Sequence, residues 1–321
     1  MKSVTVYVPA TTANLGPGFD TLGLALDLWN ETEFSQTGEG DLALSISGEG
    51  EKMLPTDETN AIAAAALQLY ALVGKDPAGL VIHCVNRIPL ISGLGSSSAA
   101  LLAGMLGANA LLGEPFSRQD ILTMATENEG HPDNVVPAML GGLVASVIHG
   151  ERIVTRKLLV SPMSITVVFP DFYFPTKAAR AILPEYVLRE DAIFNVSRAV
   201  LVIKSLETGD LALLGEVMDD SLHQPYRLPL IPGAQAAMQA ARQAGASAVA
   251  LSGAGPSLIA FSRQPADAGI GLAMQRAFEQ AGLTARIFPL NISQSGASVV
   301  DNGTATKNNS ALAPVDDHLI P

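Results

Sequence analysis

The sequence has little cysteine and no long unbroken apolar run. Cys84 is the only cysteine in 321 residues, so the chain cannot form an internal disulfide. It lies in the short apolar stretch 80–85, where we expect a buried and unreactive thiol. No apolar run reaches the roughly 18 residues of a membrane-spanning helix, and the N-terminus lacks the apolar core of a signal peptide. These absences favour a soluble protein of the cytoplasm.

Positive charge is also scarce. Lys and Arg number 19 against 31 Asp and Glu, which gives a formal net charge of −12. This balance argues against nucleic acid or an anionic membrane as the main partner. An anionic substrate would have to be held by local positive groups. The residues leave the oligomeric state open, with a homodimer as one alternative.

What is present is typical of a folded protein that mixes helices and strands, with 48% apolar and 16% charged residues. The length indicates two domains more often than one. Alternating apolar patterns predict strands at 4–8, 42–46, 80–85, 143–148, 153–159, 164–169 and 284–290. Helices are predicted at 61–72, 101–112, 118–128, 176–183, 191–206, 211–218, 234–244 and 267–281. From Ser293 onward the chain is polar and without period, and we expect the tail 293–321 to be disordered.

The stretch 89–100 has the composition of a phosphate-binding loop. Gly93 and Gly95 allow backbone angles that let successive N–H groups converge, and Ser96, Ser97 and Ser98 follow where a helix N-terminus would begin. Free N–H groups and the helix dipole at such an end attract anions. An ordinary glycine turn before a serine-capped helix is the alternative, and this stretch alone does not decide between them.

Three further segments carry polar or glycine-rich loops. The segment 10–20 holds Asn14 and Asp20, which in isolation could simply cap turns. The segment 127–134 offers carboxylates that suit Mg²⁺, with Glu129 a better ligand candidate than Glu127. His131 has no second histidine at zinc spacing, so a hydrogen bond to the turn is the simpler role. The turn 252–257 between two short strands could equally be a plain hairpin.

Taken in order, the segments 9–20, 89–100 and 252–257, with His131-Pro-Asp-Asn134 between the last two, resemble the three motifs of the GHMP small-molecule kinases. The resemblance runs from about residue 4 to 290. It implies an α+β fold of two domains, the N-terminal one (1–157) like the second domain of ribosomal protein S5 and the C-terminal one (158–292) ferredoxin-like. The turn formed by Ser252, Gly253, Ala254, Gly255, Pro256 and Ser257 would be a structural glycine-rich motif.

The resemblance implies that ATP and Mg²⁺ are the cofactors. Ser97 and Glu129 match the hydroxyl and carboxylate that hold Mg²⁺ in the family. The ATP site would comprise Asn60, Ile62, Pro89, Leu90, Ile91, Ser92, Gly93, Leu94, Gly95, Ser96, Ser97, Ser98 and Ala99.

Within the family, the details are most similar to the branch that phosphorylates L-homoserine to O-phospho-L-homoserine on the way to threonine. The positions that match its amino-acid site are Asn14, Asp20, Asn134, Thr176, Arg180 and Arg227. An ammonium group would pair with the aspartate and a carboxylate with the two arginines. Asn134 stands where mevalonate-type members have a catalytic aspartate, and an amide cannot take a proton at neutral pH. We therefore expect a reaction without a side-chain base, with Asn134, Ser97 and Glu129 as the catalytic group.

Two alternatives remain at this point. A GHMP kinase for another small alcohol would share the phosphate loop but need not have the paired arginines. A non-catalytic nucleotide or metabolite sensor on the same fold would have no need for Ser97 and Glu129, which are both present.

Overall fold

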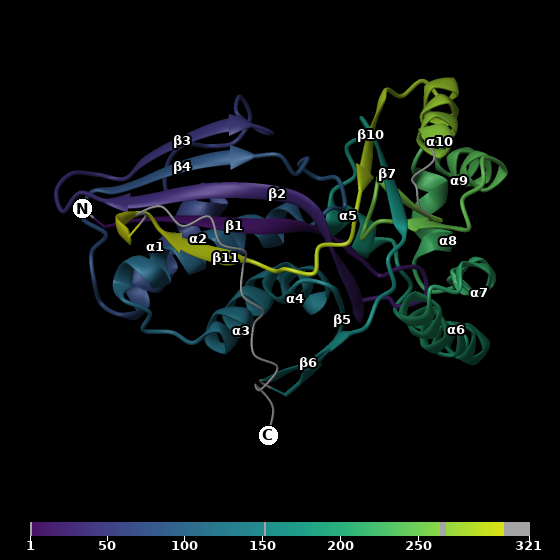
Figure 1. The fold of residues 1–321 in the computed structure, drawn as a ribbon, viewed down its shortest axis with the longest axis horizontal. Helices are drawn as coiled ribbons and strands as arrows, with labels where there is room; N and C mark the ends of the chain where they lie inside the picture. The colour runs from purple at the N-terminus through teal and green to yellow at the C-terminus, as the bar shows by residue number, and fades with distance from the viewer. Residues whose placement is uncertain (1, 151, 264–267, 305–321) are drawn as a thin grey trace.

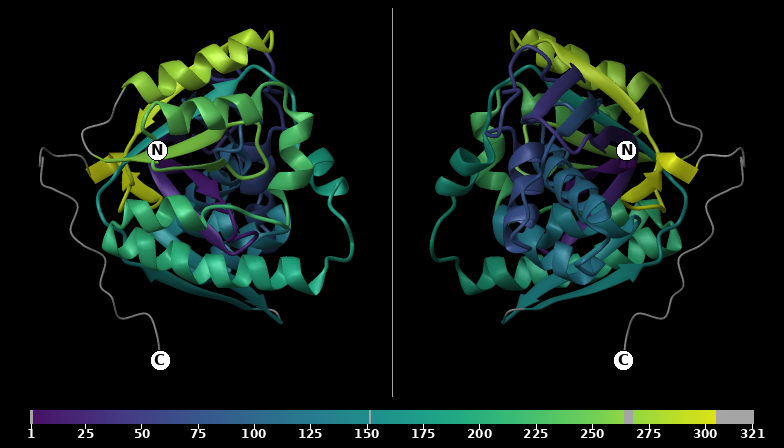
Figure 2. Two further views of the ribbon diagram at one scale, coloured as in Figure 1. Left: turned by 90° about the vertical axis from the view of Figure 1, so that its right-hand side faces the viewer. Right: turned by 90° about the vertical axis from the view of Figure 1, so that its left-hand side faces the viewer.

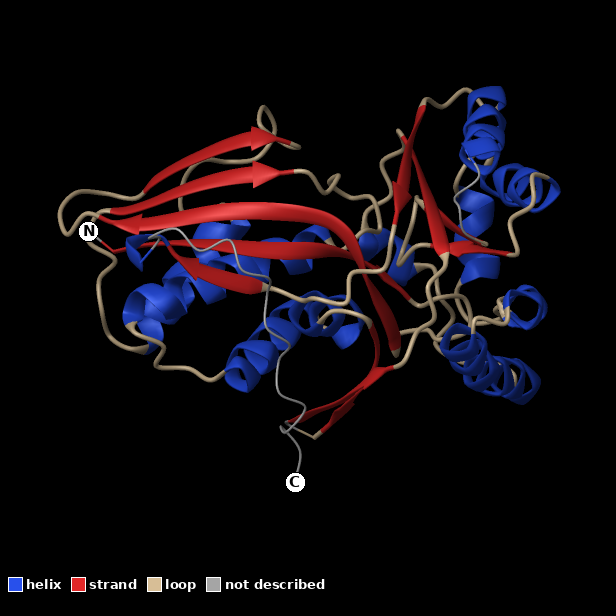
Figure 3. Ribbon diagram, in the orientation of Figure 1, coloured by secondary structure: helices blue, strands red, loops and turns tan. Residues whose placement is uncertain are grey.

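The structure is a computed structural model that describes residues 2–150, 152–263 and 268–304. It contains two β-sheets that lie side by side along the long axis of the molecule, each covered by helices (Figures 1 and 3). Within these residues no helix is long and apolar enough to cross a membrane. The mixed α+β fold predicted from the sequence is confirmed.

The larger sheet has seven strands. Five of them follow the order β11-β1-β2-β4-β3, β5 pairs with residues 22–24 at the start of β2, and β6 pairs with β5. All of its pairings are antiparallel except that between β3 and β4. Its strands are β1 (Lys2–Ala13), β2 (Leu22–Gln36), β3 (Ala43–Gly48), β4 (Leu80–Asn86), β5 (Leu143–His149), β6 (Arg152–Leu158) and β11 (Ser298–Asp301).

Four helices lie on one face of this sheet: α1 (Ala61–Leu72), α2 (Ser96–Leu112), α3 (Arg118–Glu129) and α4 (Pro132–Leu140) (Figure 1). Helices α2 and α4 contact its strands, and α1 and α3 pack against these two helices. Helix α2 lies against β1 and β2 on one side and α1 on the other, so it is apolar nearly all round. Its burial fixes the position of its N-terminus, where the serines of the predicted phosphate loop stand. Cys84 on β4 is fully buried, and burial raises the pKa of its thiol to about 11, which confirms the expected unreactive thiol.

The smaller sheet has four antiparallel strands in the order β10-β7-β9-β8: β7 (Ser164–Pro170), β8 (Ala248–Leu251), β9 (Leu258–Ser262) and β10 (Ala285–Leu290). In chain order this is strand, helices, two strands, helix, strand, which is the ferredoxin-like arrangement that was expected. Between β7 and β8 lie α5 (Thr176–Ala181), α6 (Arg189–Thr208), α7 (Leu211–Val217), α8 (Gln224–Arg227), the 3₁₀ turn Leu228–Leu230 and α9 (Ala234–Gln243), and α10 (Ala268–Gln280) precedes β10.

Helices α1 to α4 lie beneath the larger sheet, with α4 near the middle of the molecule, whereas α6 to α10 lie at the end formed by the smaller sheet (Figure 1). Helices α9 and α10 face the viewer in one end-on view, and α1 to α3 in the other (Figure 2). The division into domains at residues 157 and 158 stays a prediction. The change from one sheet to the other falls between β6 and β7, but the chain returns to the first sheet through β11.

Several predictions of local structure were wrong. The first strand was expected to stop at Pro9, but β1 continues to Ala13 past a register shift between Pro9 and Ala10 that accommodates the missing N–H. Strand β2 and the helices α4 and α8 were not predicted. The tail was expected to be disordered from Ser293, but residues 298–301 form β11 and pair with β1. Residues 305–321 lie outside the described part of the chain.

Candidate active site

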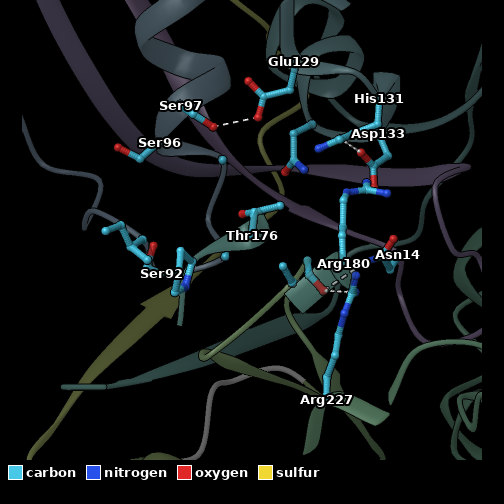
Figure 4. Close-up of a pocket in the computed structure, with 17 residues that line it drawn as sticks. Asn14, Ser92, Ser96, Ser97, Glu129, His131, Asp133, Thr176, Arg180 and Arg227 are labelled. Carbon is cyan, nitrogen blue, oxygen red and sulfur yellow. Dashed lines mark hydrogen bonds and ion pairs between the residues drawn. The ribbon is translucent and has the colours of Figure 1, made fainter. Parts of the chain in front are cut away.

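A pocket lies where the two sheets meet, and six separate segments of the chain line it (Figure 4). They are the β1–β2 loop, the loop before α2, the junction of α3 and α4, helix α5, helix α8 and the β8–β9 turn. The lining residues are Asn14, Ile91, Ser92, Gly93, Gly95, Ser96, Ser97, Glu129, His131, Asp133, Asn134, Pro175, Thr176, Arg180, Arg227, Gly253 and Ala254.

The loop before α2 forms a glycine cradle at the helix N-terminus. Gly93 and Gly95 have φ of +77° and +70°, and neither could carry a side chain. A Cβ on Gly93 would lie 2.2 Å from the Ser252 carbonyl oxygen, and one on Gly95 would lie 2.0 Å from Thr11 Oγ1. Helix α2 begins at Ser96, with its free N–H groups at the pocket. The buried Ser98 hydroxyl has no partner in the described structure. This cradle of donors suits a phosphate group.

The β8–β9 turn supports the cradle from behind. Ser252 Oγ donates to the Gly93 carbonyl at 2.7 Å, and the Ser257 backbone N–H donates to the Ser92 carbonyl at 3.2 Å. Ser252 Oγ also lies 2.9 Å from Thr12 Oγ1 on strand β1, from which it can accept. The turn is therefore more than a plain hairpin, because it fixes the backbone of the phosphate loop against β1.

Ser97 and Glu129 stand together at one end of the pocket (Figure 4). Ser97 Oγ donates to Glu129 Oε1 at 2.7 Å, from the first turn of α2 to the last residue of α3. A hydroxyl and a carboxylate are the hard oxygen ligands that Mg²⁺ takes when it also binds substrate phosphates. The described residues contain no cluster of three or more His, Cys, Asp or Glu that could hold a metal alone. Together with the adjacent cradle, the donor set fits Mg²⁺ shared with a nucleotide.

Asn134 is oriented by strand β1. Thr11 Oγ1 donates to Asn134 Oδ1 at 2.8 Å, and the residue is 9% exposed at the pocket wall. Thr11 thereby holds the Asn134 amide by its oxygen, and the Nδ2 hydrogens are available to a bound molecule.

Asp20 and Arg180 pair face to face beside the pocket. Arg180 Nη1 and Nη2 donate to the two carboxylate oxygens of Asp20 at 3.0 and 2.7 Å, a bidentate geometry. Asn14 holds the loop that carries Asp20, because its Oδ1 accepts from the Asp20 backbone N–H at 3.0 Å. Its Nδ2 donates to the Gly253 carbonyl at 2.8 Å. Two predicted substrate ligands of opposite charge are thus adjacent.

Arg227 reaches the same region from α8 and is only 1% exposed. Its Nε donates to the Ala179 carbonyl at 3.0 Å, and its Nη1 lies 3.2 Å from His223 Nδ1. Burial lowers the pKa of the guanidinium to about 10, and the charge of Arg180 acts in the same direction. Arg227 therefore keeps its charge at neutral pH.

Asp133 and His131 line the pocket although neither was a predicted site residue. His131 Nδ1 lies 2.5 Å from Asp133 Oδ1, which confirms a hydrogen bond within the turn for His131. Burial by itself lowers the pKa of His131, but the hydrogen bond and charge of Asp133 outweigh it and leave the pKa raised. The sequence feature that could have identified His131 and Asp133 is their position next to Asn134 in the polar segment 127–134.

Some residues predicted for the ATP site do not line this pocket. Asn60 caps α1, where its Oδ1 accepts from the Ile62 backbone N–H at 2.9 Å and its Nδ2 donates to the Pro55 carbonyl at 2.8 Å. Leu94, Ser98 and Ala99 are buried behind the loop. The residues outside the lining are Asn60, Ile62, Pro89, Leu90, Leu94, Ser98 and Ala99, whereas Ile91, Ser92, Gly93, Gly95, Ser96 and Ser97 face it.

Comparison with known proteins shows the family to which the two halves of the chain belong. A family described as the GHMP kinases N terminal domain matches residues 60–142, and one described as GHMP kinases C terminal matches residues 202–280. Fold and site together thus define a small-molecule kinase of the GHMP class.

The relatives narrow the class. The homoserine kinase of Moorella thermoacetica is 47% identical over 298 residues, which cover 92% of this chain and 99% of the relative. That of Microchaete diplosiphon is 41% identical over 94% of this chain and 99% of the relative. The crystal structure of homoserine kinase from Cytophaga hutchinsonii has a TM-score of 0.83 at 33% identity and covers 93% of this chain and 97% of its own. The chain belongs to the homoserine kinase family.

Proposed function

We propose that the protein transfers the γ-phosphoryl group of ATP to the hydroxyl of L-homoserine, giving O-phospho-L-homoserine and ADP, as a step of threonine biosynthesis. The observation that carries the proposal is that one pocket joins a glycine phosphate cradle to two arginines, one of which is paired with Asp20 beside the pocket. The relatives named homoserine kinase at 41% and 47% identity support the same substrate.

The nucleotide end of the pocket would be the cradle of Ser92 to Ser97. Its glycines bring backbone N–H groups to the phosphates, and the α2 N-terminus adds the favourable end of its dipole. Ser97 and Glu129 would hold Mg²⁺. When bound, the ion neutralises charge that develops on the transferring phosphoryl group.

The other end would hold the amino acid as a zwitterion. Asp20 would accept the ammonium group, and Arg180 and Arg227 would hold the carboxylate by charge-assisted hydrogen bonds. The ion pair of Asp20 with Arg180 supports this assignment. The substrate ammonium group would take the place of Arg180 beside Asp20, and the substrate carboxylate would take the place of Asp20 beside Arg180. Asn14 and Thr176 complete this side of the pocket.

Transfer would proceed without a side-chain base. Asn134 would donate an Nδ2 hydrogen to the substrate hydroxyl oxygen, while Thr11 holds the amide through its Oδ1. This contact aims the hydroxyl at the γ-phosphorus without removing its proton, which would pass to a phosphate oxygen or to water as the new O–P bond forms and the bond to ADP breaks. Catalysis then comes from positioning and from the charges around the phosphoryl group.

We also infer that the enzyme works in the cytoplasm without a nucleic-acid partner, which its net charge of −12 supports. A homodimer is one alternative for its assembly. Analytical ultracentrifugation distinguishes a monomer of 33.3 kDa from a particle of twice that mass.

The test is an assay of ADP release with Mg²⁺-ATP and L-homoserine, run beside D-homoserine, L-serine, mevalonate and no acceptor. Turnover that requires L-homoserine is expected. Faster turnover of mevalonate would overturn the amino-acid assignment and favour a kinase for another small alcohol. ATP binding without phosphorylation of any acceptor would instead favour a nucleotide sensor.

A further inference from the structure

A fully buried histidine lies directly behind Arg227. His223 is 0% exposed and immediately precedes α8, the helix that carries Arg227 at its other end. It does not line the pocket, and the proposed reaction assigns it no role.

The partners of the two ring nitrogens define its protonation. Nε2 lies 2.9 Å from the Gly16 carbonyl oxygen, which can only accept, so Nε2 carries a hydrogen. Nδ1 lies 3.2 Å from Arg227 Nη1, which can only donate, so Nδ1 must be unprotonated to form this bond. The neutral imidazole with its hydrogen on Nε2 satisfies both contacts at once.

The groups around the ring favour the same state. Burial lowers the pKa of His223, and the charge of Arg227 acts in the same direction, whereas Asp220 and the more distant Asp20 oppose them. Asp220 Oδ2 is 3.5 Å from Nε2, but the same carboxylate accepts backbone N–H bonds from His223 at 2.9 Å and Gln224 at 2.6 Å. Its charge is therefore partly balanced by the start of α8.

The ring also forms one layer of a stack. Phe19 lies parallel to His223 with ring centroids 5.1 Å apart and an interplanar angle of 19°. The guanidinium carbons of Arg227 and Arg180 lie 5.3 and 5.8 Å from the Phe19 ring centroid. Phe19 is next in sequence to Asp20, so the stack joins the groups proposed to hold the two ends of the substrate.

Arg227 is then held on three sides. The Ala179 carbonyl accepts from Nε, His223 from Nη1, and the Gly253 carbonyl lies 3.5 Å from Nη1. In the described structure Nη2 makes no hydrogen bond to the protein, and Arg227 lines the pocket. A guanidinium fixed in this way loses little freedom when it binds an anion.

We propose that His223 is a positioning residue: as a neutral imidazole protonated on Nε2, it accepts a hydrogen bond from Arg227 and fixes the guanidinium for the substrate carboxylate. This inference rests on the proposed binding of homoserine by Arg227. It assigns His223 to specificity for the amino acid and gives it no part in ATP binding.

Two variants separate the hydrogen bond from the packing of the ring. His223→Phe keeps a ring against Phe19 but removes the acceptor, whereas His223→Asn keeps an acceptor near the position of Nδ1. The phenylalanine variant is expected to raise the KM for L-homoserine about 5- to 150-fold, the range for a buried donor that loses its partner. The KM for ATP should stay within about twofold, and the asparagine variant should recover most of the homoserine affinity. The exposed His149→Phe is the matched control.

An unchanged homoserine KM in His223→Phe, or equal rises for homoserine and ATP, would overturn the proposal. A second measurement needs neither activity nor the phenylalanine variant. In ¹⁵N-histidine NMR of the wild-type protein, the His223 signals are assigned by their loss in His223→Asn. One protonated Nε2 and one unprotonated Nδ1 are expected between pH 6 and 8, and a protonated Nδ1 contradicts the inference. If the wild-type protein fails to phosphorylate homoserine, the proposed function fails while this spectrum still tests the tautomer.

Discussion

Arg180 and Arg227 are held differently, although both are proposed to bind one carboxylate. The Arg180 side chain is 35% exposed and forms an ion pair with Asp20, whereas Arg227 is buried and bonded to a backbone carbonyl and a histidine. Arg180 would therefore exchange its partner when a zwitterion enters, whereas Arg227 is already in place. In this way an acidic protein would hold an anionic group with two aimed arginines.

Replacement of Arg227 by leucine tests the buried guanidinium. Each charge-assisted hydrogen bond contributes roughly 1.5–3 kcal/mol. The Arg227→Leu variant should therefore raise the KM for homoserine about 10- to 150-fold at 1.4 kcal/mol per decade. The KM for ATP should change little, and steady-state kinetics with each substrate varied in turn measures both.

Arg242→Leu is the control for this change, because Arg242 is half exposed and its ion pair with Asp219, at 3.6 Å, lies outside the pocket. It should leave both constants unchanged. Equal rises of both KM values in Arg227→Leu would instead assign the arginine to phosphate binding or to support of the fold.

Asn134→Ala tests the reaction without a base. Loss of one neutral hydrogen bond to the substrate hydroxyl is worth about 0.5–1.5 kcal/mol, so kcat should fall about 2- to 10-fold. Single-turnover measurements at saturating substrates report this change. A complete loss of turnover with normal binding of both substrates would show that Asn134 does more than position the hydroxyl.

The resemblance to the GHMP kinases indicated the charged ligands but not the groups that orient them. Asp20, Arg180 and Arg227 were assigned because they match the family's motifs, and their charges suit the two ends of a zwitterion. Phe19 and His223 could not be assigned, because their role depends on a stack between the β1–β2 loop and the start of α8 that exists only in the folded chain. The same holds for Thr11, whose contact with Asn134 spans 123 residues of sequence.

At the scale of elements, the phosphate loop depends on close packing against two neighbours, and paired glycine substitutions test this. Gly93 and Gly113 both have positive φ, +77° and +87°, near the two ends of α2. A Cβ on Gly93 meets the Ser252 carbonyl at 2.2 Å, whereas one on Gly113 meets nothing within 4 Å. Gly113→Ala should cost only the backbone strain of about 1–2 kcal/mol.

Gly93→Ala should cost more stability than Gly113→Ala and should also raise the KM for ATP, because the loop must move away from the β8–β9 turn. Thermal unfolding and nucleotide kinetics of the two variants give the comparison. The same loss of stability and an unchanged ATP KM in both would mean that the close approach to Ser252 has no part in shaping the loop.

Helix α4 and strand β2 were not predicted, because their prolines and glycines serve a contact between the two elements. Helix α4 begins with Pro132 and contains Pro137, so its composition is that of a turn. Pro137 cannot bond the Asp133 carbonyl, and a Cβ on Gly23 of β2 would lie 1.9 Å from that carbonyl oxygen. The proline in α4 and the glycine in β2 are thus explained by one tertiary contact. Helices with regular caps, such as α1 behind Asn60, were predictable because their signals are local.

At the scale of the whole molecule, the last strand of the described chain pairs with the first. Strand β11 pairs antiparallel with residues 4–7 of β1, so the end of the described chain covers the strand with which it begins (Figure 1). Before it, the Ala297 backbone N–H donates to the Ala138 carbonyl at 2.8 Å, and Arg118 Nη2 donates to the Ala297 carbonyl at 3.1 Å. The polar composition after Ser293 gave no sign of this return, because a four-residue edge strand needs little apolar sequence.

Two shortened chains test what this pairing contributes. A chain that ends at Ala297 lacks β11 and the following 3₁₀ turn, whereas one that ends at Thr304 keeps both. The shorter chain should have a Tm several degrees lower, because β1 loses the hydrogen bonds of one edge and Val299 no longer packs against the core.

The kcat of the shorter chain at 25 °C should be close to that of the longer chain, since β11 pairs with residues 4–7 and the pocket lies beyond Thr11 at the other end of β1. Calorimetry and the ADP-release assay on both chains measure these effects. Equal Tm values would mean that β11 does not stabilise the sheet, and a lower kcat at equal Tm would connect this end of the sheet to the active site.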